Sequence, residues 1–377
     1  MLTWPLICSV LFAEALIATL FLTPMAKRVG ERWRLVDIPD PERKVHTAIT
    51  ARSGGLAMAG AFFLVLGVNL IAAFALRDRV PFVGPEVARF VANVPTVGWE
   101  IGALLLGTCV AVGVGLLDDR RPLPAGMKLL GQIVAAGILV SAGIHVRLFG
   151  LPDWVGMVVT VLWVVGLTNA FNFLDNMDGL SAGVASICAA VLLWALFCAG
   201  ERFTPALLSV FLGCTLGFLW HNWFPARLFM GDGGSHFLGF FLAAVSVLGT
   251  YYQPEGDTAR LAILLPVIVF GLPLFDMVTV TVIRLSQGRS PFQADTQHFS
   301  HRLVALGMRP PRAVLTIYLL TFAIGLSGLA LLHLPPAQAW VHLIAVALIF
   351  AVIWLLEHVG RQTNGGGESP HGEAKED

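Results

Sequence analysis

The sequence predicts an all-α fold, a polytopic membrane bundle of about eleven transmembrane helices. Hydrophobic residues make up 56% of the 377 residues and charged residues only 13%, against about 25% charged in an average soluble domain. The apolar residues also gather in runs of about 20, the length that a helix needs to cross the hydrocarbon core of a bilayer. We therefore expect an integral membrane protein.

The eleven apolar runs follow one another along most of the chain. They cover residues 2–26, 54–76, 97–117, 128–146, 155–174, 180–199, 205–222, 235–252, 261–283, 313–333 and 338–357. We assign residues 1–360 to one membrane domain. The Gly-rich, polar residues 361–377 are predicted to form a disordered cytoplasmic tail.

The basic residues orient the bundle. Of the 24 Lys and Arg residues, 18 fall on the connections 27–52, 118–128, 175–179, 223–234 and 284–312 or on the tail. The alternate connections hold six, namely Arg77, Arg79, Arg89, Arg147, Arg202 and Arg260. Basic residues accumulate on the cytoplasmic side of membrane proteins, so the N-terminus is predicted outside and the C-terminus inside. Equal numbers of acidic and basic residues give no indication of a nucleic-acid partner.

Two acids close the third predicted span. Asp118 and Asp119 stand in GLLDDRRPLPAGMK, and Lys128 opens the next span. Two adjacent acids could end a helix at the membrane surface by pairing with Arg120 and Arg121. Alternatively, they belong to a site on the inside face.

The fifth predicted span ends in TNAFNFLDNMDGLSAG, where Asn172, Asp175 and Asp178 recur every three residues. If the helix continues, the three side chains share an arc of about 120° and face a common space. Their oxygens suit a hard divalent cation or a nucleotide. The alternative is a solvated helix end closed by Gly179. Asn169 and Asn172 favour function, because polar groups at such depth in a span are costly.

Asp232 precedes Gly233, Gly234 and Ser235 at the start of the eighth predicted span. It could act simply as a helix N-cap. It could also hold a metal beside backbone N–H groups and a helix N-terminus, where phosphate is favoured. Phe229, three residues earlier, is either an aromatic residue at the membrane interface or a platform for a base.

The last inside loop contains DTQHFSHRL, with His298, His301 and Arg302 close together. Two histidines alone are more typical of a polar loop. With an arginine beside them they could hold a diphosphate, because guanidinium matches phosphate oxygens. Asp276, inside a span about two turns before Arg284, is expected to support this site. Glu14, also inside a span, has no explanation from the sequence.

These segments together resemble a known family. GLLDDRRPLPAGMK, NFLDNMDGLSAG, HNWFPARLFMGDGGS and DTQHFSHRL, in this order, look like the signature set of the polyprenyl-phosphate N-acetylhexosamine-1-phosphate transferases, glycosyltransferase family 4. The first inside loop, VDIPDPERKVHTAITARSGGLAM, resembles that family too, with His46 and Arg52 in place. The chain is most similar to the undecaprenyl-phosphate GlcNAc-1-phosphate transferases, which begin teichoic acid, O-antigen or capsule polymers.

The resemblance implies a role for each site residue. Asp118 with Asp119 would deprotonate or orient the lipid phosphate. Asp232, with Asp175, would hold Mg²⁺, for which Mn²⁺ could substitute. Phe229 would stack on uracil. Catalytic roles are expected for Asp118, Asp119, Asp232, His298, His301 and Arg302, and substrate binding for Lys128, His46, Arg52, Asn172, Asp175, Asp178, Asn222 and Phe229. The family's histidine motif usually reads His-x-His-His-Arg, whereas this chain has Ser300 at the middle position.

The implied reaction moves a sugar 1-phosphate from a UDP-N-acetylhexosamine to undecaprenyl phosphate on the cytoplasmic face of the plasma (inner) membrane. The alternative within the family is the phospho-MurNAc-pentapeptide transferase of peptidoglycan synthesis, whose histidine loop carries three consecutive histidines. A more distant alternative is a cation-coupled transporter, but transporters place acids near the midplane, and here the acids end spans on one side. The partners expected are the bilayer and the two substrates, with a homodimer left open.

Overall fold

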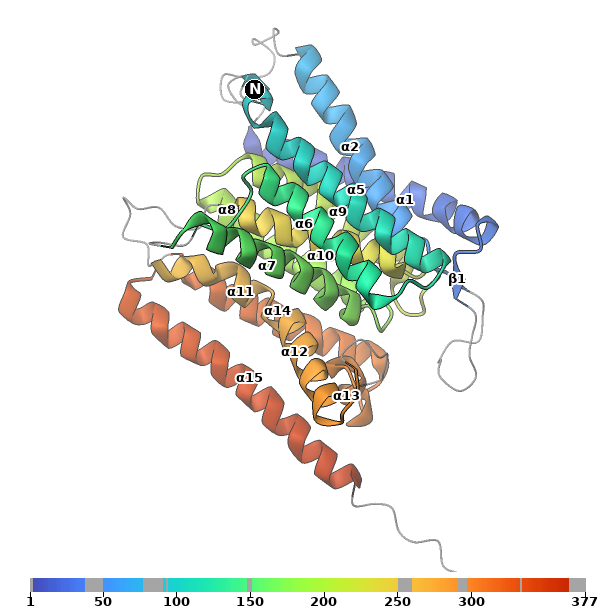
Figure 1. Ribbon diagram of the computed structural model, residues 1–377, viewed down its shortest axis with the longest axis vertical. Helices are drawn as coiled ribbons and strands as arrows, with labels where there is room; N and C mark the ends of the chain where they lie inside the picture. Colours follow the sequence, from blue (N-terminus) through green and yellow to red (C-terminus); the bar gives the residue numbers. More distant parts are fainter. Residues whose placement is uncertain are drawn as a thin grey trace, which may run out of the picture.

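The computed structural model of the protein describes residues 3–37, 50–76, 91–92, 94–147, 151–249, 260–290, 297–332 and 334–365. Within this part the fold is all-α, as predicted, apart from one antiparallel pair of two-residue strands (Figure 1). The elements are α1 (Trp4–Arg32), β1 (Val36–Asp37), β2 (Thr50–Ala51), α2 (Gly54–Leu76), the 3-10 helix η1 (Val94–Val97), α5 (Gly98–Arg120), α6 (Ala125–Ser141), α7 (Asp153–Leu174), α8 (Leu180–Cys198), α9 (Phe203–Asn222), α10 (Gly231–Leu248), the 3-10 helix η2 (Arg260–Leu264), α11 (Leu265–Val269), α12 (Gly271–Ser286), α13 (Phe299–Ala305), α14 (Pro310–Ala330) and α15 (Pro336–Gly365).

Nine helices of the described residues are long and apolar enough to cross a membrane. They are α1, α2, α5, α7, α8, α9, α10, α14 and α15. The two remaining predicted spans correspond to α6, an apolar helix of 17 residues, and to α11 with α12, which together pass the same test as a bent pair. The polytopic helical bundle is thus confirmed, while the number of crossings stays a prediction. Helix α15 runs to Gly365, past the predicted domain boundary at residue 360.

The ninth predicted span is broken rather than straight. The two segments, 262–269 and 271–286, meet at an angle of 60°. Pro273 explains the break, because proline lacks an N–H and its ring clashes with the carbonyl four residues earlier, here that of Val269. The break redirects α12 toward the end of the bundle that carries α13 (Figure 1).

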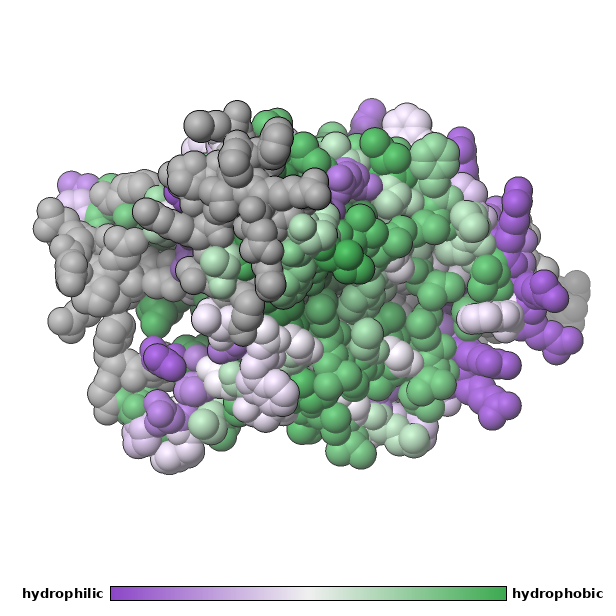
Figure 2. Space-filling model, turned by 90° about the horizontal axis from the view of Figure 1, so that it is seen from above, coloured by the Kyte–Doolittle hydropathy of each residue, from purple (hydrophilic) through white to green (hydrophobic). Residues whose placement is uncertain are grey.

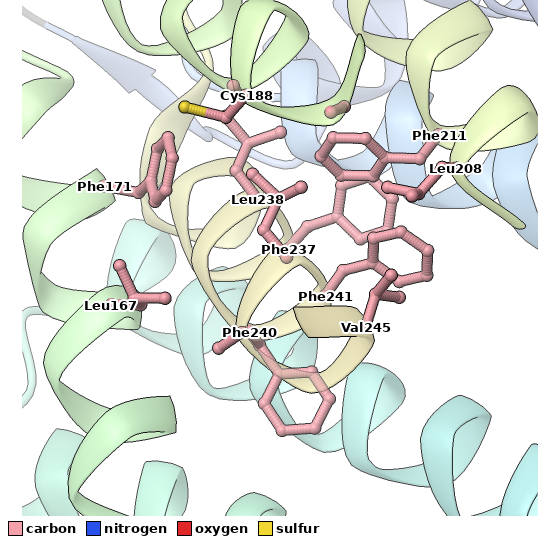
Figure 3. Packing of buried hydrophobic residues seen from close by; sticks show 14 of the residues in the cluster. Leu167, Phe171, Cys188, Leu208, Phe211, Phe237, Leu238, Phe240, Phe241 and Val245 are labelled. Atoms are coloured by element: carbon pink, nitrogen blue, oxygen red, sulfur yellow. The ribbon is translucent and has the colours of Figure 1, made fainter. Parts of the chain in front are cut away.

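Helix α10 lies at the centre of the bundle, among α5, α7, α8 and α9 (Figure 1). Every residue from Gly233 to Ser246 is buried. Aromatic rings fill the space beside it. Phe241 stacks on Phe211 of α9 with ring centroids 4.8 Å apart (Figure 3). The ring of Phe62 of α2 lies edge-on to that of Phe241, with centroids 4.9 Å apart. Because its surroundings are tightly packed, α10 holds its N-terminal residues in a defined place.

The outer surface of the bundle is apolar. Phe21, Ile71 and Trp220 are more than 70% exposed, and Figure 2 shows a hydrophobic surface with hydrophilic residues gathered toward the ends. A bilayer would cover such a surface. The C-terminal end of α5 and the N-terminal ends of α2, α6 and α10 meet at one end of the bundle, which is where the predicted site residues lie.

Candidate active site

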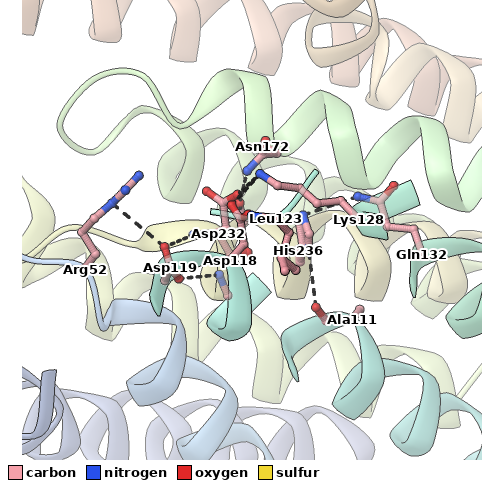
Figure 4. A network of polar contacts seen from close by, with 12 residues as sticks. Arg52, Ala111, Asp118, Asp119, Leu123, Lys128, Gln132, Asn172, Asp232 and His236 are labelled. Atoms are coloured by element: carbon pink, nitrogen blue, oxygen red, sulfur yellow. Dashed lines mark hydrogen bonds and ion pairs between the residues drawn. The ribbon is translucent and has the colours of Figure 1, made fainter. Parts of the chain in front are cut away.

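Three carboxyl groups and one ammonium form the centre of the site (Figure 4). Asp118 and Asp119 stand in the last turn of α5, Asp232 in the first turn of α10, and Lys128 in the first turn of α6. The Nζ atom of Lys128 lies 2.5 Å from Oδ2 of Asp118 and 3.0 Å from Oδ2 of Asp232. Asp118 therefore pairs across helices, which supports the site interpretation over a simple helix stop.

Asp119 has a different role from Asp118. Its two oxygens accept hydrogen bonds from the backbone N–H groups of Asp232 and Gly233, each at 2.9 Å, and its side chain is 0% exposed. The first N–H groups of a helix have no partner within the helix, and a carboxylate there also interacts favourably with the helix dipole. Asp119 thus caps α10 from the neighbouring helix and holds Asp232 against the end of α5.

Arg52 lies on the other side of Asp119, just after strand β2, with its Nε atom 4.0 Å from Oδ1 of Asp119. Burial opposes the charge of the guanidinium, but Asp119, Asp232 and Asp37 more than offset it and raise the pKa of Arg52. Arg52 therefore stays cationic beside the acids. His46, the other residue predicted from this loop, lies outside the described residues.

Two glycine contacts allow the helices to come this close. A Cβ atom on Gly115 of α5 would lie 2.4 Å from the backbone oxygen of Asp232, and one on Gly55 of α2 would lie 2.1 Å from the backbone nitrogen of Gly234. Neither distance is compatible with a side chain, so both positions need glycine. The end of α10 is consequently held between α5 and α2 with no space to shift.

A second, buried polar layer lies one helical turn from the acids, and two of its members, Gln132 and His236, were missed in the sequence. His236 follows Asp232 by four residues and Gln132 follows Lys128 by four, so each pair shares a helix face. The Nε2 atoms of Gln132 and His236 are 3.4 Å apart, and Asn169 of α7 donates to Gln132 at 2.7 Å. The i, i+4 spacing from the two recognised residues was the signal that could have identified this layer.

The end of α7 differs from the prediction. The helix stops at Leu174, and residues 175–179 form turns, so Asn172, Asp175 and Asp178 do not share one helical stripe. Gly179, at φ 74°, takes the left-handed conformation that ends such a turn before α8. The chain leaves the helix early, and the three side chains point to different partners.

Asn172 donates to Ser235 of α10 at 2.9 Å, beside the acids. Asp175 is half-buried and lies within the electrostatic influence of Arg52, Asp232 and Asp119. Burial raises the pKa of Asp175 to about 7; Arg52 opposes this, and the neighbouring carboxylates add to it. Asp175 therefore belongs to the acidic cluster, which consists of Asp118, Asp119, Asp175 and Asp232.

Asp178 and Asn222 hold two connections together. Asp178 accepts a hydrogen bond from the backbone N–H of Ala226 at 2.9 Å. Asn222, only 3% exposed, accepts from the N–H of Gly179 at 3.0 Å and donates to the carbonyl of Leu228 at 2.9 Å. Both polar atoms of the Asn222 amide are thus engaged by the backbone. The structure gives these residues a scaffolding role, and their contact with substrate stays a prediction.

Phe229 is fixed by its backbone to the strand that precedes Arg52. Its N–H donates to the carbonyl of Ala51 at 2.9 Å, and its carbonyl accepts from Gly54 at 3.0 Å. The side chain is half-buried. The backbone of Phe229 is therefore held beside the start of α2, and its role in stacking on uracil stays a prediction.

The histidine loop forms a second cluster on α13. Asp276 of α12, 1% exposed, accepts hydrogen bonds from the backbone N–H of Phe299 at 2.6 Å and contacts Nδ1 of His298 at 2.9 Å. Arg302 donates to the carbonyl of Gln297 at 2.6 Å and contacts the hydroxyl of Thr279 at 3.3 Å. Asp276 supports this cluster as expected, by capping α13 and orienting His298.

The end of α7 lies between the two clusters. The ring of Phe173 packs against that of His298, with centroids 5.6 Å apart. The guanidinium carbon of Arg284 lies over the same Phe173 ring, 5.0 Å from its centroid. The neighbouring Asn172 contacts α10 instead. The end of α7 therefore contacts α10, which carries Asp232, through Asn172 and the histidine loop through Phe173.

The donor atoms of the acidic cluster suit a hard divalent cation. Lys128 and Arg52 are two cationic side chains among four carboxyl groups, and oxygen is the ligand that Mg²⁺ prefers. Within the described residues, no three His, Cys, Asp or Glu side chains are arranged to hold a metal. Mg²⁺ is usually held by one or two carboxylates together with substrate phosphates, so two of these carboxyl groups would be enough to hold it.

Comparison with known proteins agrees with the resemblance of the motifs. Residues 101–250 match the family described as Glycosyl transferase family 4. The chain is 32% identical over 359 residues to a probable undecaprenyl-phosphate N-acetylglucosaminyl 1-phosphate transferase of Bacillus subtilis, covering 93% of this chain and 91% of that protein. It is also 32% identical to a decaprenyl-phosphate N-acetylglucosaminephosphotransferase of Mycobacterium leprae, over 93% of this chain and 90% of the relative.

A phospho-N-acetylmuramoyl-pentapeptide-transferase of Desulforudis audaxviator is less similar, at 28% identity over 65% of this chain and 78% of its own length. The matched region of the family spans α5 to α10, which contribute all three central acids. The chain belongs to glycosyl transferase family 4, in the branch whose named members are N-acetylglucosaminyl 1-phosphate transferases acting on polyprenyl phosphates.

Proposed function

We propose that the protein transfers N-acetylhexosamine 1-phosphate, in the first instance GlcNAc 1-phosphate, from a UDP-sugar to undecaprenyl phosphate. The products are undecaprenyl-diphosphate-sugar and UMP, and the reaction begins the synthesis of a cell-envelope polysaccharide. The similarity to a relative of that name over 93% of the chain carries this proposal. The acidic cluster around Lys128 supports the proposal, because all of the residues of this cluster lie within the region that matches the family.

The reaction exchanges one phosphoanhydride for another. An oxygen of the lipid phosphate becomes bonded to the sugar-bearing phosphorus, and the bond from that phosphorus to UMP breaks. Both partners are anionic, so catalysis depends mainly on positioning and on neutralising charge. Lys128 and Arg52 supply positive charge beside Asp118, Asp119 and Asp232. We infer that His301 and Arg302 of α13, with His298 just before this helix, contact the donor diphosphate; the packing of Phe173 of α7 against His298 supports this.

We also propose that the reaction depends on Mg²⁺, with Mn²⁺ as a substitute, and that Asp232 and Asp175 hold it. Bound there, the ion would neutralise charge on the diphosphate oxygens. Asp232 stands at the N-terminus of a helix, where backbone N–H groups favour phosphate as well. The carboxylates would otherwise repel the substrates, so the cation requirement follows from the charge of the site.

We place the site on the cytoplasmic face of the plasma membrane. The support is the distribution of basic residues, 18 of 24 of which lie on the side that carries the acidic cluster. Nucleotide sugars are water-soluble and negatively charged, so an active site at the end of the bundle gives them access without crossing the bilayer. The choice between a monomer and a homodimer stays open to measurement.

An assay with purified protein tests the proposal directly. Protein, Mg²⁺ and undecaprenyl phosphate are incubated with UDP-GlcNAc, UDP-GalNAc or UDP-MurNAc-pentapeptide, and both UMP and the lipid product are measured. We expect turnover with a UDP-N-acetylhexosamine. Turnover of UDP-MurNAc-pentapeptide alone would move the protein to the peptidoglycan branch, and absence of UMP with every donor would reject the transferase function.

A further inference from the structure

Ser300 occupies the position where the histidine motif departs from its usual sequence, and it makes a specific contact. Its side chain is 1% exposed, and its hydroxyl donates to Oδ1 of Asn176 at 2.5 Å. The amide nitrogen of Asn176 in turn donates to the carbonyl of Phe173 at 2.7 Å. This chain of two hydrogen bonds, the Ser300–Asn176 contact, joins α13 to the turn that follows α7.

The two ends of the contact belong to the two clusters. His301 and Arg302 follow Ser300 directly on α13. Asp175 precedes Asn176 and lies within the electrostatic influence of Arg52 and Asp232. A UDP-sugar that reaches both clusters can bind only if α13 and this turn have the correct spacing and relative orientation. The Ser300–Asn176 contact joins these two segments.

Helix α13 needs such a contact because it is short. Seven residues are too few for a helix to be stable by itself, so its neighbours determine its position. Asp276 holds its N-terminal end through Phe299 and His298. Arg302 also contacts Thr279 at 3.3 Å, so these contacts hold α13 to α12. Ser300 adds a directional bond on the side of the helix, and His301 lies 100° further round the same helix.

We propose that Ser300 and Asn176 are positioning residues that fix the rotation of α13, and thereby the placement of His301 and Arg302 toward the donor diphosphate. The proposal rests on the proposed function for its kinetic consequence. Its structural consequence, the orientation of His301, does not depend on which substrate the protein uses.

The kinetic test compares Ser300→Ala, Asn176→Ala and the double variant in the UDP-GlcNAc assay. A correctly placed cation binds the diphosphate in the ground state as well as in the transition state, so its displacement raises KM rather than lowering kcat. Loss of one hydrogen bond corresponds to a rise of about three- to tenfold in donor KM, with the acceptor KM unchanged. Asn176→Ala also removes the bond to Phe173, so the double variant should be no worse than Asn176→Ala alone, because both single variants remove the Ser300–Asn176 contact. Ser300→Thr, which keeps the hydroxyl, should restore the wild-type donor KM.

Ser186→Ala is the matched control. Ser186 is also buried and also bonds a side chain on another helix, Thr215, at 2.8 Å, but it lies between α8 and α9 in the interior of the bundle. Its loss should lower thermal stability by as much as the loss of Ser300, without changing the donor KM. A donor KM in Ser300→Ala within twofold of that in Ser186→Ala would overturn the proposal, as would additive effects of the two single variants.

A second readout separates this proposal from the proposed function. Modification of His301 by diethyl pyrocarbonate, followed by mass spectrometry, reports the orientation of α13 without any substrate. We expect the modification rate to rise at least about threefold in Ser300→Ala and Asn176→Ala and to stay unchanged in Ser186→Ala. If the wild-type protein turns over no UDP-sugar but His301 responds in this way, the function fails and the positioning role stands. If turnover is normal and His301 does not respond, the positioning role fails alone.

Discussion

Asp118 and Asp119 are adjacent in sequence, yet the structure predicts that they fail in different ways when each is replaced by asparagine. Asp119 has both oxygens bonded to backbone N–H groups of α10 and is 0% exposed. Asp118 bonds the N–H of Leu123 at 2.6 Å and the ammonium of Lys128, and it is 11% exposed. Asp119 therefore has a structural role in holding α10, whereas Asp118 is positioned beside Lys128 within the site.

The expected magnitudes follow from these bonds. In Asp119→Asn the amide oxygen can accept from one N–H of α10, while the NH₂ group opposes the other. An N–H group of α10 left without an acceptor costs about 1–3 kcal/mol. The charge of Asp119 adds nothing to this loss, because burial and the neighbouring Asp232 disfavour it and raise the pKa of Asp119 to about 7. We expect the free energy of unfolding to fall by about 1–3 kcal/mol. In Asp118→Asn the amide oxygen can still accept the hydrogen bond from the N–H of Leu123. Lys128 also keeps its ion pair with Asp232. The free energy of unfolding should therefore fall by less than about 1.5 kcal/mol.

Thermal denaturation in detergent and turnover, measured on the same preparations, distinguish the two variants. Asp118→Asn should keep a near-wild-type melting temperature and lose about 10²–10⁴-fold in turnover, the range for a side chain that acts on the reacting groups. Asp119→Asn should lose both stability and turnover. Equal melting temperatures for the two variants, with equal loss of turnover, would refute the capping role and place Asp119 on the substrate.

Four further outcomes are expected. Asp232→Asn should lose nearly all turnover, and EDTA should silence the wild type until Mg²⁺ or Mn²⁺ is restored; full activity in chelator would exclude the metal. Phe229→Ala should lose about 1–3 kcal/mol of uridine-nucleotide affinity, with Phe229→Trp tolerated, whereas calorimetry showing unchanged affinity would return Phe229 to a membrane-interface role. In a cysteine-free background of intact cells, an impermeant thiol reagent should label a cysteine at Arg147 but not one at Gln287, and the reverse pattern would invert the topology. Burial raises the pKa of Asp175 from 3.8 to about 7, so the unfolded state holds fewer protons and stability should fall as pH rises from about 4 to 7. Burial also raises the pKa of Asp119 to about 7, which contributes to the same slope. Asp175→Asn should therefore reduce the slope in melting curves of metal-free protein without abolishing it, and an unchanged slope would contradict this prediction.

Much of the fold could be predicted because a bilayer imposes its length on helices. The apolar runs at 54–76, 155–174 and 180–199 agree with the observed helices to within about two residues at each end. The exceptions have local causes that hydropathy does not include. Pro273 breaks the ninth span, and α1 continues to Arg32 because charged residues at its end can stay helical outside the bilayer.

The site was predictable in membership more than in arrangement. Rare acids at span ends identify Asp118, Asp119 and Asp232, because charges in or near a span are costly unless they are used. The sequence could not show that Asp119 caps α10, since that depends on the approach of two helices more than a hundred residues apart. It also suggested a helical stripe after Asn172 that the turn at 175–179 replaces.

Helix α10 is the element on which the site depends most. Its first turn carries Asp232, its N-terminal N–H groups are capped by Asp119, and its next turn carries His236 against Gln132. The packing around these residues leaves no space. Gly55 of α2 and Gly115 of α5 both lie so close to the backbone of α10 that neither position admits a side chain. A carboxylate in such surroundings has few alternative orientations, so Asp232 is held in place before any substrate binds. Pre-organised charges of this kind need no rearrangement when the reaction begins, and this favours catalysis of a step whose main requirement is charge neutralisation.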